Sequence, residues 1–163
     1  MLAKIYENEL GFTAEFKFTY DISIGKLWNA LVNNENFKFW MDHLEITDLC
    51  KGGNINFHYN DGSGKVEKLM ITDYVDGKVL QFDWGMDTVR FEISAHSSTG
   101  SQLLLTEFLK EITDHTPKDL AGWHVCLLRF QDFMKSENHV KSEEEWEKWY
   151  CEYKVLVQRL IRG

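Results

Sequence analysis

Two ionisable side chains stand in apolar stretches of the sequence, where a protonatable group can do chemistry. His124 follows Trp123 in a stretch whose apolar residues recur at spacings of three and four, so its ring can reach the space beneath a helix. There an imidazole serves as an acid or a base, or more commonly as a hydrogen-bonded structural residue. Glu107 lies among leucines in a stretch of alternating residues. If its face of the strand is inward, its carboxyl group needs a partner or takes a raised pKa; an outward Glu107 paired with a strand neighbour is the simpler arrangement.

Metal binding and nucleophilic catalysis have no support in the sequence. The 6 histidines stand singly, without an H-E-x-x-H motif or a Cys/His cluster, so we expect no metal ion and no cofactor. No G-x-S-x-G motif is present, and no cysteine has a recognisable catalytic context. The glycines Gly52, Gly53, Gly62 and Gly64 read as hairpin turns, because they lack the strand-to-helix setting of a phosphate loop. We therefore assign no catalytic residue from these motifs.

The composition excludes some partners and favours one compartment. The chain has 163 residues, which suits one domain spanning residues 1–163 with a sizeable core. Its formal net charge of -8 repels phosphate backbones, so nucleic acid is not expected as a partner. The N-terminus has no apolar signal region and no uncharged run is long enough for a bilayer, so we expect no membrane insertion. The 3 cysteines are odd in number and far apart, which predicts reduced thiols and a cytoplasmic location.

Aromatic residues make up 14% of the chain, and many of them alternate with polar residues as in half-buried β-strands. The first such stretch spans residues 12–20 and follows a polar lead. Later stretches are separated by short turns, which predicts an antiparallel meander because parallel neighbours need long crossovers. The bulky side chains suit either a core or the lining of an apolar pocket. The later strands are expected at residues 55–59, 66–75, 80–84, 89–95 and 103–109.

Three further signals predict helices outside this sheet. Ser23 is the expected N-cap of a short helix, and a second apolar cluster at residues 37–41 predicts another. Residues 142–163 form a helical extension, with Ser142 as cap, glutamates in the first turn and arginines in the last. Its apolar stripe is expected to pack on its own domain, and the alternative is a homodimer.

The long helix expected over residues 117–134 is the element on which the strands would pack. Thr116 is its expected cap, and Pro117 suits the first helical position, where its missing N–H is not needed. Asp119 lies near the positive end of the helix dipole. Gly122 costs about 1 kcal/mol relative to alanine inside a helix, and a close approach of the helix to the sheet or a loop is the simplest reason for it.

The order of these elements resembles the helix-grip fold of the START-like, or SRPBCC, superfamily. Four motifs carry the resemblance, and they are closest to the branch named after the activator of the heat-shock protein 90 ATPase. The resemblance implies an α+β fold in which a curved antiparallel sheet wraps around the long helix, with two short helices after the first strand and an extra terminal helix. The motifs are Lys26-Leu27-Trp28-Asn29-Ala30-Leu31, Phe39-Trp40, Val79-Leu80-Gln81-Phe82-Asp83-Trp84 and Ala121-Gly122-Trp123-His124-Val125-Cys126-Leu127.

In that superfamily the sheet and the long helix enclose a deep apolar cavity that takes hydrophobic small molecules. For this chain the resemblance implies an aromatic lining, with Trp40 near the entrance and Glu107 and His124 as polar anchors. The implied lining residues are Phe57, Tyr59, Trp84, Phe91 and Trp123.

The leading hypothesis is therefore a small binding protein for a hydrophobic small molecule, not an enzyme. The resemblance also implies two alternatives. One is a co-chaperone-like partner of heat-shock protein 90 with a role in the stress response, although the further N-terminal domain of the full-length activator has no counterpart here. The other is a cyclase- or dehydratase-type enzyme that uses the same cavity, with His124 or Glu107 as acid or base.

Overall fold

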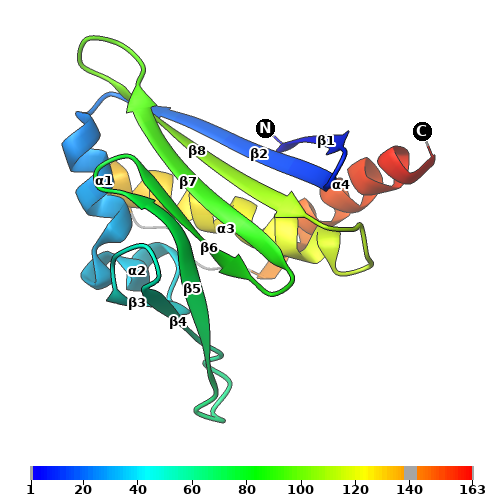
Figure 1. Ribbon diagram of the computed structural model, residues 1–163. Coiled ribbons are helices and arrows are strands. Elements are labelled where there is room, and N and C mark those ends of the chain that lie inside the picture. The colour runs from blue at the N-terminus through cyan, green and yellow to red at the C-terminus, as the bar shows by residue number, and fades with distance from the viewer. Residues whose placement is uncertain (1, 138–142, 163) are drawn as a thin grey trace.

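The computed structural model describes residues 2–137 and 143–162, and in these ranges an eight-stranded antiparallel sheet curves around the long helix α3 (Figure 1). The expected α+β helix-grip fold is confirmed, with two short helices after β2 and a further helix at the end. The strands are β1 (Lys4–Asn8), β2 (Gly11–Tyr20), β3 (Leu44–Asp48), β4 (Asn54–His58), β5 (Val66–Val75), β6 (Val79–Trp84), β7 (Asp87–Ala95) and β8 (Ser101–Leu109). The helices are α1 (Ile24–Val32), α2 (Asn34–Trp40), α3 (Thr116–Met134) and α4 (Glu143–Arg162).

The sheet contains the expected meander, and β2 joins it by pairing with its last strand, β8. Its strand order is β1-β2-β8-β7-β6-β5-β4-β3, and every neighbouring pair is antiparallel. The register shifts between Ile46 and Asp48 and between Ile71 and Asp73, and such bulges increase the twist of a sheet. Strand β1 forms in the stretch that reads as a polar lead. It is mostly exposed, so hydrogen bonding to β2 holds it where no apolar pattern predicted a strand.

The start of α1 agrees with the sequence, whereas those of α2 and α3 differ. The helix expected at residues 37–41 begins earlier, at Asn34, because the Asn33 side chain caps it by accepting the Glu35 N–H at 3.0 Å. Ser23 Oγ accepts a hydrogen bond from the Lys26 N–H at 3.3 Å and so caps α1 as expected. Thr116 is not the cap of α3 but its first residue, and its Oγ1 accepts a hydrogen bond from the Thr113 N–H at 2.9 Å. The prediction was wrong because the loop before α3 uses this hydroxyl for its own turn. His115 therefore precedes the helix without a side-chain capping bond.

Helix α4 packs on α3 at the end of the molecule where β1 also lies (Figure 1). The expected packing of its apolar stripe on its own domain is confirmed at Tyr153 and Val157, which are both buried. The hydroxyl of Tyr153 accepts the Ala3 N–H at 2.9 Å and lies 2.6 Å from Nδ1 of His124. The capping role predicted for Ser142 falls outside the described residues.

Large aromatic side chains fill the space between α3 and the middle of the sheet. Trp40 of α2 packs against Phe91 of β7 and Phe130 of α3, with ring centroids 6.2 Å and 4.9 Å away. Trp123 of α3 lies 6.0 Å from Phe91, and all four rings are buried. This part of the fold is core, and the four rings leave no room for a ligand between them. No helix in the described ranges combines the length and the apolar character that a membrane crossing needs.

Candidate functional site

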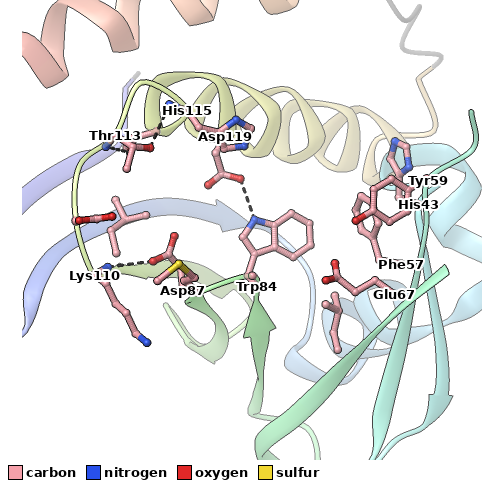
Figure 2. A pocket seen from close by; sticks show the side chains of 16 residues that line it. His43, Phe57, Tyr59, Glu67, Trp84, Asp87, Lys110, Thr113, His115 and Asp119 are labelled. Atoms are coloured by element: carbon pink, nitrogen blue, oxygen red, sulfur yellow. Dashed lines mark hydrogen bonds between the residues drawn. The ribbon is translucent and has the colours of Figure 1, made fainter. Parts of the chain in front are cut away.

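A cavity of about 630 Å³ lies beside the N-terminal end of α3 and is open on one side (Figure 2). The β4–β5 hairpin forms one wall, and the turn after β6 and the loop before α3 form the other. Leu69 and Leu109 are apolar lining residues from β5 and β8. The curved sheet and the start of α3 thus leave a hollow at the point where the aromatic core ends.

Trp84 stands at the centre of this cavity. Its ring lies 4.9 Å from that of Trp123 in the core and 5.5 Å from that of Phe57 on the hairpin. Phe57 in turn stacks on His43 at 5.0 Å and meets Tyr59 edge-on at 5.3 Å. The last residue of β6 therefore joins the core to an aromatic wall that faces the open side.

A second cavity of about 410 Å³ adjoins the first along α3. It extends past Gly122 towards Trp146 of α4. A methyl group placed on Gly122 would meet nothing within 4 Å, so the close approach expected at this glycine is wrong. The glycine borders open space instead. The two cavities share His43, Phe57, Trp84, His115 and Asp119 in their linings.

Carboxyl groups gather at the end of the cavity nearest α3. Trp84 donates its indole N–H to Oδ1 of Asp119 over 2.8 Å, and Asp87 Oδ1 accepts the backbone N–H of Lys110 at 3.0 Å (Figure 2). Glu107 of β8 lies behind them, with its side chain 0% exposed. The outward arrangement of Glu107 is therefore wrong: its face of β8 turns towards α3.

Among the described residues, no N–H group and no hydroxyl group donates to the carboxyl oxygens of Glu107, and the carboxyl group of Asp119 is its polar neighbour. Burial raises the pKa of Glu107 well above its ordinary 4.5, and the hydrogen bond with Asp119 and the charges of Asp119 and Asp87 raise it further. Burial also raises the pKa of Asp87. A proton on Glu107 lets its carboxyl group lie beside Asp119 without repulsion between two negative charges, so the site favours the protonated form of Glu107.

Of the five residues implied as a lining, four line a cavity and one belongs to the core. Phe57, Tyr59 and Trp84 line the larger cavity, and Trp123 lines the smaller one. Phe91 lines neither and belongs to the core.

Two further implied positions also differ from expectation. Trp40 is not near an entrance, because α2 directs it onto Phe91 and Phe130 in the core. His124 faces α4, where it stacks on Trp149 at 3.9 Å. It lines neither of these two cavities, and its Nδ1 lies 2.6 Å from the Tyr153 hydroxyl.

Several lining residues have no signal in the sequence. His43 and Glu67 come from the segments around the β4–β5 hairpin, while Asp87 follows the turn after β6. Asp119 reads in the sequence only as a charge near a helix start. Its place at the site depends on the tryptophan 35 positions earlier that donates to it.

Solved structures share this fold at low sequence identity. A conserved protein of unknown function from Enterococcus faecalis has a TM-score of 0.85 at 20% identity, covering 97% of this chain and 91% of that one. CalU16 from Micromonospora echinospora has a TM-score of 0.71 at 16% identity over 90% of this chain and 88% of its own. A protein from Bordetella parapertussis has a TM-score of 0.72 at 16% identity, covering 87% and 84%. At these identities the likeness shows the fold alone.

None of the curated proteins compared with this chain matches it. The family model described as Activator of Hsp90 ATPase homolog 1-like protein matches residues 21–135. The match runs from the end of β2 through the whole meander to the end of α3, and so takes in both walls of the cavity. The chain therefore belongs to the family of Activator of Hsp90 ATPase homolog 1-like proteins.

Proposed function

We propose that this protein binds a hydrophobic, ring-containing small molecule in the larger cavity, on the aromatic wall around Trp84. The single observation that carries the proposal is the combination of open volume and aromatic lining at one place. A volume of about 630 Å³ matches the range of small-molecule sites, and such sites are mostly apolar with a few convergent polar groups. The family and its fold fit a ligand-binding domain.

The location differs from the deep cavity that the sequence resemblance implied. The middle of α3 is packed by Trp123 and Phe130, which are buried against the sheet. A ligand at Trp84 would need no displacement of these rings. The proposal therefore places the ligand at the start of α3 and leaves the core intact.

Replacing Phe57 by alanine tests the aromatic wall. Phe57 is half-buried and supplies ring contacts to the cavity, so we expect Phe57→Ala to weaken binding of the neutral apolar dye Nile red about tenfold, as the loss of one aromatic contact predicts. Fluorescence titration of the full chain measures the dissociation constant.

Phe108→Ala is the matched control for this experiment. Phe108 is an exposed phenylalanine of β8, next to Glu107 in sequence and therefore on the opposite face of the sheet. The control should bind the dye as the unaltered protein does. Failure of the unaltered protein to bind, or an equal loss in both variants, would refute the site.

A second candidate function is action on an Hsp90-type chaperone in the cytoplasm, as part of a stress response. The description of the family supports it, and so does the formal net charge of -8, which gives an acidic surface for a basic partner. An ATPase assay with the chaperone checks this candidate: we expect stimulation that Phe57→Ala leaves unchanged. Absence of both a complex and stimulation at micromolar concentration would rule the candidate out.

A further inference from the structure

We propose that the ligand of the larger cavity carries a protonated amine, which Asp119 and Asp87 bind while Trp84 and Phe57 hold its aromatic part. This inference rests on the proposed function, because it names the class of ligand for the same cavity. Carboxylates and aromatic faces are the two kinds of protein group that attract an organic cation. Both kinds meet at Trp84.

The geometry places the carboxyl groups at one end of the aromatic wall. The indole N–H of Trp84 fixes Asp119 at the edge of its ring over 2.8 Å, and Phe57 lies 5.5 Å away at the other side. Figure 2 shows Trp84 between Asp119 and Asp87 on one side and Phe57 on the other. A flat molecule lying on Trp84 would have a charged end at the carboxyl groups and a ring at the hairpin.

Glu107 supplies an independent observation that points to a cation. Its side chain is 0% exposed, no N–H or hydroxyl group among the described residues donates to its oxygens, and its polar neighbour is the carboxyl group of Asp119. A buried carboxyl group without a donor lowers stability unless something else compensates for it. An ammonium group bound at Asp119 would provide that compensation from the cavity side.

The protein does not supply this cation itself. No ion pair with Lys or Arg is formed by Asp87, Glu107 or Asp119 within the described ranges. The Lys110 side chain points away from Asp119 in Figure 2. Nor does any group of three His, Cys, Asp or Glu side chains in the described part of the chain suit a metal ion. An organic ammonium needs fewer ligands and can also use the ring faces.

Binding of an amine should release a proton. Without a ligand, burial beside Asp119 favours the protonated form of Glu107, whereas an arriving ammonium group favours its ionised form, so a proton passes to the buffer. The affinity for the amine should therefore rise with pH, whereas that for an uncharged analogue should not. Of the charged and titratable groups nearby, Asp87 from β7 acts on Glu107, Lys110 and Glu111 from the loop before α3 act on Asp87, and His115 lines the same cavity.

Calorimetric titration of the full chain with tryptamine, tryptophol and indole-3-acetate tests the inference, because these probes share a ring and differ in charge. We expect tryptamine to bind at least about tenfold more tightly than tryptophol at pH about 8, a ratio that shrinks towards pH about 6, and indole-3-acetate to bind most weakly. Tryptamine binding should also show an enthalpy that depends on the buffer. Tryptophol binding as tightly as tryptamine overturns the amine and leaves the proposed function standing. Absence of binding by all three and by Nile red overturns both.

Asp119→Asn tests the same inference through the protein. Asparagine can still accept the Trp84 N–H through its Oδ1 but has no charge. We expect the tryptamine affinity to fall at least about tenfold and the tryptophol affinity to stay within about twofold. Glu9→Gln, which removes an exposed carboxylate outside both cavities, is the control and should keep the ratio of the tryptamine affinity to the tryptophol affinity. An unchanged ratio in Asp119→Asn would overturn the inference.

Discussion

Glu107→Gln is expected to abolish a loss of stability that the protein undergoes as the pH rises above 6.5. In the folded protein the Glu107 carboxyl group keeps its proton, because burial and the neighbouring Asp119 raise its pKa well above 4.5. In the unfolded chain the same group ionises near 4.5. The folded state then binds more protons, so the free energy of unfolding falls as the pH rises towards the folded pKa, by up to about 1.4 kcal/mol per pH unit. Glutamine holds no such proton, so this contribution disappears.

The pH range of this prediction starts at 6.5 because, below that pH, His124 changes the stability in the opposite direction to Glu107. Burial lowers the pKa of His124 from 6.5 to about 4. Between these values the unfolded chain binds the additional proton, so the stability that neutral His124 contributes is lost as the pH falls from 6.5 towards 4. Below 6.5 the contributions of His124 and Glu107 oppose each other. Above 6.5 the Glu107 contribution is no longer offset by His124.

Urea unfolding between pH 6.5 and about 8.5 measures this slope for the unaltered protein and the variant. Glu111→Gln is the matched control, because Glu111 is an exposed carboxylate four positions further along the chain. It should keep the slope of the unaltered protein. Parallel curves for the unaltered protein and Glu107→Gln would contradict a proton held at Glu107.

The facing of Glu107 illustrates which part of the fold could be predicted locally. An alternation of period two predicted the strand but fitted either face, because leucines lie on both. In the sheet Glu107 pairs with Ala14 of β2 and Val89 of β7, both fully buried, and this register turns its face towards α3. Pairing with a strand more than 90 positions earlier has no signature in the local pattern. The strands with an alternating pattern and the helices were therefore predictable, whereas β1, which has no such pattern, and this facing were not.

For the candidate site, the sequence could predict aromatic side chains on the inner face of the sheet but not which of them line the cavity. Aromatic alternation indicated inward-facing rings, but whether a ring joins the core or lines the cavity depends on where the helices cross the sheet. Trp40 packs against Phe130 of α3 and Phe91 packs against Trp123, while Phe57 and Trp84 line the cavity beside the start of α3. His124 was expected between helix and sheet. Its ring does lie 6.0 Å from that of Phe16 of β2, but it also contacts Trp149 and Tyr153 of α4, which the stripe of α3 alone could not show.

Tyr153→Phe is expected to lower the free energy of unfolding by about 2–3 kcal/mol, because it removes one hydroxyl that serves two buried groups. Tyr153 Oη accepts the Ala3 N–H, and its own proton can go to Nδ1 of His124 at 2.6 Å. Phenylalanine keeps the ring packing against Phe16 and His124 but leaves both polar groups without a partner. Thermal and urea unfolding measure the loss.

Two further variants distinguish loss of this shared hydroxyl from general loosening of α4. Tyr150→Phe removes a half-buried hydroxyl from the same helix, for which the described residues show no hydrogen bond, and should change stability by less than about 0.5 kcal/mol. The double variant His124→Phe with Tyr153→Phe removes both partners of the hydrogen bond between Tyr153 Oη and His124 Nδ1. Its loss of unfolding free energy should therefore be smaller than the sum of the losses in the two single variants by about 1 kcal/mol. The Ala3 N–H stays without a partner in that variant, so recovery should be incomplete. Strict additivity would mean that the Tyr153 hydroxyl stabilises α4 through β1 and not through His124.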